Sequence, residues 1–162
     1  MRAIKTIIAT ILVPGTACFL IPYFILKAAN TSLNPTIGIL KVFAILAAAF
    51  GTGMVIWVST AFVRLGKGTP VPIEPPTRLV ISGLYRYIRN PMYTGALLII
   101  LAEALYFNAI NIVIYAGVLW AIFQALLVVY EEPQLKRRFG IAYEDYLASV
   151  PRWLPKVQRK IE

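Results

Sequence analysis

The chain has 162 residues, of which 59% are hydrophobic and only 14% charged, and its formal net charge is +9. A soluble domain of this length cannot bury so much apolar surface, so the composition indicates a single domain in a lipid bilayer. The sequence has no histidine and one cysteine, Cys18. It therefore excludes a histidine general base, a Ser-His-Asp triad, histidine or cysteine-cluster metal sites and an internal disulfide.

Charged residues delimit the first two predicted membrane-spanning helices. Residues 6–26 and residues 42–63 carry no charge. As a helix, each stretch would be roughly 31–33 Å long, which is enough to cross the hydrocarbon core of a bilayer. The second stretch also contains a run of small residues, a pattern that favours close contact between helices. These residues are Ala47, Ala48, Ala49, Gly51 and Gly53.

The third apolar stretch, residues 92–130, is too long for one span. Its only charge is that of Glu103, and as one helix it would extend about 58 Å, nearly twice the thickness of the core. We therefore expect it to fold back near Asn108 and Asn111. The fold predicted is an all-α integral membrane protein with about four transmembrane helices. The last two spans are residues 92–107 and 111–130.

The basic residues set the predicted orientation. Four spans place the N-terminus, the loop of residues 64–91 and the C-terminal tail on one side, and these segments hold 14 of the 16 lysine and arginine residues. By the positive-inside rule this side is cytoplasmic, so both termini are cytoplasmic in a multi-pass protein. Positive charge at a membrane surface indicates anionic lipid as a partner rather than nucleic acid. A cleaved signal peptide over the first 26 residues is the alternative, but the apolar stretch is too long for one.

Two blocks of polar residues carry the candidate chemistry, and the first is residues 68–95. Its first half holds four prolines, so we expect an extended connector there. In its second half, a helical turn would place Tyr85, Arg89 and Tyr93 on one face. Asn90 would cap the following helix, and the free amides of that helix start favour an anion. A simple interfacial belt of tyrosine and arginine would show the same pattern.

The second block begins where the fourth span ends, at Glu131 and Glu132. Two adjacent carboxylates at a helix C-terminus are unfavourable without partners, which Arg137, Arg138 or a cationic ligand would provide. Pro133 is expected to bend the chain out of the membrane. The apolar residues that follow have helical spacing, which predicts an amphipathic helix on the cytoplasmic surface. They are Leu135, Phe139, Tyr143, Tyr146, Leu147 and Val150, with Trp153 after them as an interfacial anchor.

The predicted hairpin brings the two blocks together. Two spans return the chain to the side it left, so Gly95 and Glu131 are expected at the same cytoplasmic interface. One polar cluster beside the lipid phase could then accept a charged, water-soluble molecule from one side and a lipid-like molecule from the other. The cluster consists of Tyr85, Arg89, Asn90, Tyr93, Glu131 and Glu132.

Both blocks also carry the motifs of a known family. The run GLYRYIRNPMYTG, followed about 36 residues later by EEPQLKRRFGIAYEDYLASVP, resembles the signature of the isoprenylcysteine carboxyl methyltransferase family and its phospholipid methyltransferase relatives. The resemblance covers about residues 66–155. It implies one membrane-embedded domain, residues 1–162, in which residues 1–64 form two N-terminal spans and residues 65–162 the cofactor-binding catalytic region.

The resemblance implies that the chain is an enzyme that transfers a methyl group from S-adenosylmethionine to a lipid-like or isoprenylated acceptor, by carboxyl methylation, at the cytoplasmic interface. A sulfonium suits aromatic faces, and the amino-acid carboxylate of the cofactor suits an arginine or a helix N-terminus. The cofactor contacts that the resemblance implies are Thr77, Arg78, Leu79, Val80, Tyr85, Asn90, Pro91, Met92, Tyr93 and Glu131. The catalytic residues expected beside them are Glu132, Arg89 and Arg152.

Two positions depart from the family pattern. Asn90 replaces a histidine and keeps its hydrogen-bonding capacity. Leu127 replaces the arginine that holds the substrate carboxylate in the prenylcysteine enzymes, which leaves the acceptor open. It could be a carboxylate held by Arg152, a phospholipid amine with Glu132 as the base, or another apolar molecule. The alternatives are a phosphatidylethanolamine-type N-methyltransferase and a non-catalytic membrane subunit that binds anionic lipid.

Overall fold

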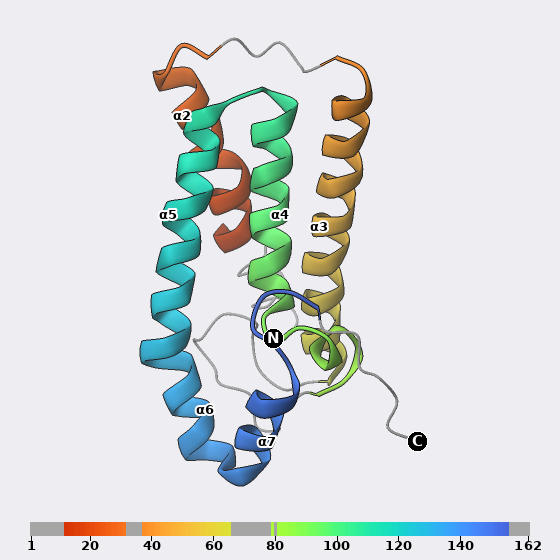
Figure 1. The fold of residues 1–162 in the computed structure, drawn as a ribbon, viewed down its shortest axis with the longest axis vertical. Helices are drawn as coiled ribbons and strands as arrows, with labels where there is room; N and C mark the ends of the chain where they lie inside the picture. The colour runs from red at the N-terminus through yellow and green to blue at the C-terminus, as the bar shows by residue number, and fades with distance from the viewer. Residues whose placement is uncertain (1–11, 32–36, 66–78, 80, 156–162) are drawn as a thin grey trace.

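The computed structural model describes residues 12–31, 37–65, 79 and 81–155. Within these ranges every regular element is a helix and no strand occurs, so the predicted all-α fold is confirmed for the described part of the chain. The long helices run side by side, and two short helices lie beneath one end of them (Figure 1).

The first described helical segment covers residues 12–28 and includes the π-helical turn η1 (Thr16–Leu20) and α2 (Ile21–Ala28). It is followed by α3 (Ile39–Leu65), the 3-10 turn η2 (Gly83–Arg86), α4 (Pro91–Tyr106) and α5 (Ile110–Leu126). The π-helical turn η3 (Leu127–Glu131) joins α5 to α6 (Glu132–Phe139), and α7 (Ile141–Ser149) is the last helix described.

Two helices are long and apolar enough to cross a membrane, Ile39–Ala61 and the continuous helix Ile110–Phe139. The segments Leu12–Ala28 and Pro91–Tyr106 are apolar but shorter. Only 22% and 17% of the two long apolar windows is buried within the protein. Helices that are apolar on nearly all sides and mostly exposed are typical of contact with lipid.

The helix boundaries follow the charge pattern except at Pro133. The α4–α5 turn contains Asn108 with φ +49°, so the chain folds back where it was expected to. The helix does not end at Pro133 but continues through this proline to Phe139, and the exit of the chain from the membrane at this position stays a prediction. The π-helical turn η3 lies directly before Pro133 and accommodates it, since i→i+5 bonding alters the local hydrogen-bond pattern. The helix ends at Gly140, whose φ of +54° favours glycine.

Two glycines make a close contact between α3 and α4. A Cβ atom at Gly51 would lie 2.7 Å from the carbonyl oxygen of Gly95, and a Cβ at Gly95 would lie 2.9 Å from that of Gly51. Only glycine allows two helix backbones to approach so closely. The predicted contact through the small-residue run is therefore confirmed at Gly51, whereas Gly53 faces open space.

The bundle core lies between the first helical segment, α3, α4 and α5. Its side chains are small or branched, which allows close packing. The Tyr115 hydroxyl of α5 also donates to the carbonyl oxygen of Ala17 at 2.9 Å, so it ties the first segment to the hairpin. The buried core consists of Cys18, Leu26, Val55, Ala96, Ile99, Ile100, Ala104, Ala109, Ile112 and Ala116.

The C-terminal part differs from the single amphipathic helix that was predicted. It forms two helices, α6 and α7, which meet at Gly140. Their apolar stripe is packed against itself: Tyr143, Tyr146 and Val150 are buried, and four half-buried side chains surround them. The stripe therefore holds α6, α7 and the connector together. The surrounding residues are Leu79, Leu135, Phe139 and Leu147.

Candidate functional site

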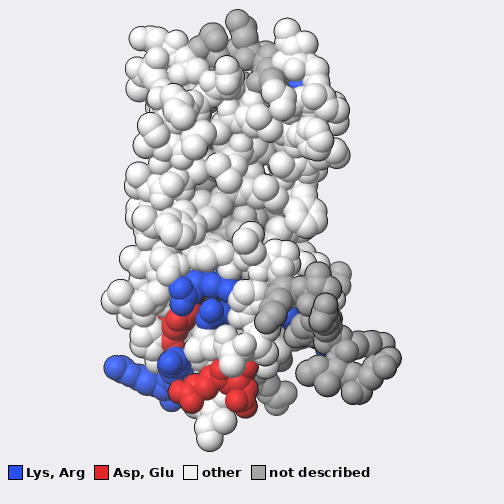
Figure 2. Space-filling model, viewed as in Figure 1, with Lys and Arg blue, Asp and Glu red and all other residues white. Residues whose placement is uncertain are grey.

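The candidate site lies where α4 begins and α5 passes into α6. On the face shown in Figure 2, most of the charged side chains gather at this end of the molecule and the rest of the bundle is nearly uncharged. Pro91 is the first residue of α4 and Asn90 occupies the N-cap position, as predicted. The Asn90 side chain does not cap the helix. Its Nδ2 atom donates instead to the carbonyl oxygen of Arg152 at 3.4 Å.

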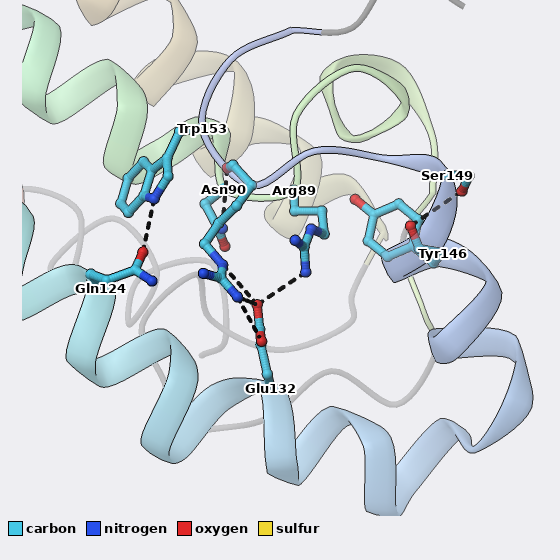
Figure 3. A network of polar contacts seen from close by, with 8 residues as sticks. Arg89, Asn90, Gln124, Glu132, Tyr146, Ser149 and Trp153 are labelled. Atoms are coloured by element: carbon cyan, nitrogen blue, oxygen red, sulfur yellow. Dashed lines mark hydrogen bonds and ion pairs between the residues drawn. The ribbon is translucent and has the colours of Figure 1, made fainter.

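Glu132 is the centre of an ion network (Figure 3). Arg89 Nη1 donates to Glu132 Oε1 at 3.0 Å, while Arg152 binds both carboxylate oxygens, Nε to Oε1 at 2.9 Å and Nη2 to Oε2 at 3.0 Å. The side chains of Arg89 and Glu132 are 13% and 15% exposed. Two guanidinium groups thus share one largely buried carboxylate, so these three side chains together carry one net positive charge.

The partners of Glu132 come from distant segments of the chain. Arg89 is 43 residues away in sequence and Arg152 is 20 residues away. The sequence suggested Arg137 or Arg138 as local partners of the two glutamates. In the network around Glu132 the arginines are instead Arg89 and Arg152.

Glu131 has a different environment from its neighbour. Its Oε1 accepts a short hydrogen bond from the Tyr93 hydroxyl. The Tyr93 ring stacks on Phe123 of α5, with ring centroids 4.5 Å apart and an interplanar angle of 20°. The hydroxyl and the ring of Tyr93 are therefore both fixed, and the start of α4 is joined to α5 and η3.

The single helical turn predicted for Tyr85, Arg89 and Tyr93 does not form, because only Tyr93 lies on α4 and Arg89 precedes that helix. Tyr85 lies on the separate turn η2, and its carbonyl oxygen accepts a hydrogen bond from the Tyr146 hydroxyl at 2.8 Å. Burial raises the pKa of the Tyr85 hydroxyl, and the nearby Tyr146 and Glu131 raise it further. Burial also raises the pKa of Tyr143 to about 12. At neutral pH these hydroxyls stay protonated, so they serve as hydrogen-bonding groups and not as bases.

Residues 150–153, which we call the C-terminal strap, cross the start of α4. Pro151 restricts the residue before it, and Val150 is accordingly extended, with φ −118° and ψ 126°. The backbone N–H of Arg89 donates to the carbonyl oxygen of Pro151 at 3.0 Å. Together with the bond from Asn90, this contact fixes the strap to the start of α4.

The far end of the strap is held by α5. The indole N–H of Trp153 donates to Gln124 Oε1 at 2.9 Å (Figure 3). The ring centroid of Trp153 lies 6.2 Å from that of Trp120. Trp153 was predicted as an interfacial anchor, and its hydrogen bond to α5 was not foreseen. The sequence feature that could have indicated this hydrogen bond is Gln124, a polar amide within a long apolar run.

Two buried polar atoms at the start of α4 have no hydrogen-bond partner among the described residues, Arg89 Nε and Thr94 Oγ1. Buried polar atoms are normally paired. These two lie on either side of Tyr93 in the sequence, at the end of α4 that carries the ion network. Glu103 Oε2 is also buried and unpaired, but it lies near the opposite end of α4.

The structure brings together most of the predicted cluster. Arg89 contacts Glu132, Tyr93 contacts Glu131, and Asn90 contacts Arg152. Three other predicted cofactor residues pack in the protein interior. Pro91 is fully buried, Met92 packs against the bundle core, and Leu79 packs against the C-terminal apolar cluster. Thr77, Arg78 and Val80 lie outside the described residues.

The position that departs from the family pattern, Leu127, is buried in η3 and only 2% exposed. It contributes an apolar side chain to the interior. The guanidinium groups at this end of the molecule come instead from Arg89 and Arg152, on the start of α4 and on the strap.

Comparison with known proteins agrees with these motifs. The model of a family described as phospholipid methyltransferase matches residues 39–142. Protein-S-isoprenylcysteine O-methyltransferase B of Arabidopsis thaliana is 36% identical over 103 residues, 60% of this chain and 52% of that protein. Its A counterpart from the same plant is 33% identical over 104 residues, 64% of this chain and 51% of that protein.

A protein-S-isoprenylcysteine O-methyltransferase of Schizosaccharomyces pombe is 34% identical over 80 residues, 49% of this chain and 34% of that protein. The matched region thus spans about half the length of the plant relatives and a third of the yeast one.

Proposed function

The chain belongs to the phospholipid methyltransferase family, and on this premise we propose that it is a membrane enzyme that transfers a methyl group from S-adenosylmethionine to the carboxylate of an isoprenylated cysteine. The names of the curated relatives support this acceptor within the family. The choice between a carboxylate and a phospholipid amine rests on the charges of the site.

The observation that carries the proposal is the pairing of Glu132 with both Arg89 and Arg152. Arg89, Arg152 and Glu132 together carry one net positive charge, and the two guanidinium groups can bind an anionic acceptor. Glu132 is also a poor candidate for the base that an amine acceptor requires, because both of its oxygens already accept guanidinium hydrogen bonds. We infer that Glu132 orients the two arginines until the acceptor enters, and that Arg152, with Arg89, then binds the acceptor carboxylate.

The residues around Tyr93 suit the cofactor. Tyr93 offers an aromatic face, Glu131 offers a carboxylate for an amine or hydroxyl, and Asn90 and the unpaired Arg89 Nε offer donors for an anion. When bound, S-adenosylmethionine supplies the methyl group as an electrophilic carbon on its sulfonium. Contacts through Thr77, Arg78, Leu79 and Val80, as well as Tyr85, Pro91 and Met92, remain predictions from the resemblance.

Methylation of a carboxylate requires little proton transfer from the protein. The acceptor is already ionised at neutral pH, and the ester product is neutral. The side chains therefore have to bind the carboxylate, orient it and exclude water, which a site without histidine can do.

The arrangement in the membrane is part of the proposal. Four spans, at 12–28, 39–61, 91–106 and 110–130, would place the candidate site at the cytoplasmic interface together with both termini. A lipid-like acceptor would then reach the site from the bilayer and S-adenosylmethionine from the cytoplasm. Anionic membrane lipid would contact the basic residues around the site.

The proposal is tested by methyl transfer in reconstituted vesicles. We expect protein supplied with methyl-labelled S-adenosylmethionine to label farnesylated cysteine that has a free carboxylate, and mild base to release the label as methanol. The methyl ester of the same acceptor should remain unlabelled. Label in phosphatidylethanolamine would support the N-methyltransferase instead, and no label in either acceptor would support the non-catalytic subunit.

A matched pair of variants serves as the control for that assay. Arg152→Gln and Arg137→Gln each remove one positive charge from the C-terminal region, but only Arg152 contacts Glu132. Transfer should fall strongly in Arg152→Gln and persist in Arg137→Gln, whose side chain is exposed. Equal activity in the two variants would contradict the role assigned to Arg152.

A further inference from the structure

We propose that the C-terminal strap is a clasp over the acceptor side of the site, and that it must release from α5 for a lipid-like acceptor to enter. This inference rests on the proposed function, because it concerns how a bilayer-borne acceptor reaches Arg152. It assigns roles to Gln124 and Trp153, which hold the clasp closed.

The strap crosses the place where α4 meets α5. At one end the carbonyl oxygens of Pro151 and Arg152 are bound at the start of α4, and at the other end Trp153 is bound to Gln124 of α5. The stacked pair of Tyr93 and Phe123 joins the same two helices close to these contacts in sequence. The strap therefore bridges the two helices that carry the site (Figure 3).

The end of the strap at Trp153 lies on the side of α5 that faces lipid in the proposed arrangement. Trp120, one helical turn before Gln124 and on the same face of α5, is 46% exposed. An indole with an apolar body and one hydrogen-bond donor suits the border between lipid and a polar site. Release of Trp153 would thus open the polar network towards the bilayer.

The strap is held firmly at Val150 and by one side-chain hydrogen bond at Trp153. The strap lies outside the helices, and Pro151 and Pro155 prevent it from extending α7. Val150 is its fixed end, because it is buried and its N–H donates to the carbonyl oxygen of Tyr146 at 3.0 Å. At the other end, one hydrogen bond joins Trp153 to Gln124.

The acceptor carboxylate can replace the carboxylate of Glu132 as the partner of Arg152. Its guanidinium binds Glu132 in a bidentate pair, and an acceptor carboxylate offers the same two oxygens. An incoming acceptor can therefore take the place of Glu132 on Arg152 without leaving this cation unpaired.

A reversible tether tests whether the strap has to move. In a Cys18→Ala background, Gln124→Cys and Trp153→Cys would be joined by a short bifunctional thiosulfonate reagent that reduction cleaves. We expect the joined protein to lose most of its transfer to farnesylated cysteine and to regain it on reduction, with unchanged affinity for S-adenosylhomocysteine. Leu154→Cys alone in the same background, treated with the same reagent, should keep its activity, because this side chain is exposed.

A spin label gives a second measurement that does not depend on activity. Leu154 and Ile141 are 78% and 76% exposed, and each would be labelled as a single cysteine in the Cys18→Ala background. We expect farnesylated cysteine with a free carboxylate, and also Gln124→Leu, to increase label mobility at position 154 but not at 141. The methyl ester of the acceptor should have a smaller effect.

The outcomes separate the clasp from the proposed function. Full transfer by the joined protein, or label mobility at position 154 that neither acceptor nor Gln124→Leu changes, would overturn the clasp and leave the methyltransferase in place. Absence of transfer in the unmodified protein would overturn the proposed function itself.

Discussion

At the residue scale, Glu131 and Glu132 are adjacent in the chain but contact different groups. Successive residues of a helix point about 100° apart, so Glu131 reaches Tyr93 while Glu132 reaches Arg89 and Arg152. This geometry separates the two carboxylates that looked unfavourable together in the sequence. In the proposed function Glu131 serves the cofactor and Glu132 serves the acceptor.

This division predicts which variants lose the cofactor. We expect Glu131→Gln to weaken S-adenosylhomocysteine binding by about 1.5–3 kcal/mol, since a hydrogen bond to a charged group is lost. Tyr93→Phe keeps the ring that stacks on Phe123 and should cost only about 0.5–1.5 kcal/mol. Calorimetric titration of the detergent-purified protein measures both effects. Glu144→Gln, which removes an exposed acidic charge on α7, is the control, and an equal affinity in Glu131→Gln would remove Glu131 from the site.

The composition of this cluster could be predicted from the sequence, but its pairing could not. The charges and the hairpin were sufficient to bring Tyr93 and Glu131 to one interface. The partner of Glu132 depends on the path of the chain after Pro151, which returns Arg152 to the start of α4. No local spacing encodes such a return, because it results from tertiary packing of α7.

At the element scale, the hairpin of α4 and α5 was predictable because its cause is simple. An apolar stretch about twice as long as the bilayer core has to fold back. The π-helical turn η3 and the helix that continues past Pro133 were not predictable, since proline usually ends or kinks a helix. The apolar stripe of α6 and α7 was recognised, but the same spacing fits lipid contact and burial against a neighbouring helix equally well.

The contact between α3 and α4 gives a prediction about stability. Gly51→Ala should destabilise the protein by about 1–3 kcal/mol, because its methyl group would collide with the backbone of α4 and force the helices apart. Gly53→Ala on the same helix faces open space and should be neutral or stabilising by up to about 1 kcal/mol, since alanine favours helix. Thermal unfolding in detergent compares the two variants. An equal midpoint for both would show that the helices do not approach closely at Gly51.

At the scale of the whole molecule, apolar surface and charge are separated along the bundle. On the face in view, the sides of the bundle are nearly uncharged and the charges gather at the end that holds the site (Figure 2). The long apolar windows leave most of their side chains exposed. A protein with such a surface is stable in a bilayer, and its charged end belongs at the interface with water.

The proposed orientation can be tested with single cysteines at the two ends. Asn108 lies exposed in the α4–α5 turn, and Leu154 lies exposed beyond the strap. Four spans with cytoplasmic termini place these residues on opposite sides of the membrane. In a Cys18→Ala background, an impermeant thiol reagent added to intact bacterial cells should therefore label Asn108→Cys but not Leu154→Cys, and inverted membrane vesicles should give the reverse.

The unaltered protein is the control for this experiment, because its one cysteine is buried and should stay unlabelled from both sides. Labelling of Leu154→Cys in intact cells and of Asn108→Cys in inverted vesicles would place the site on the outer face, away from cytoplasmic S-adenosylmethionine. Labelling of both positions from one side would mean that the helix between them does not cross the membrane. Only the opposite-sided result is consistent with a site that takes its methyl donor from the cytoplasm and its acceptor from the bilayer.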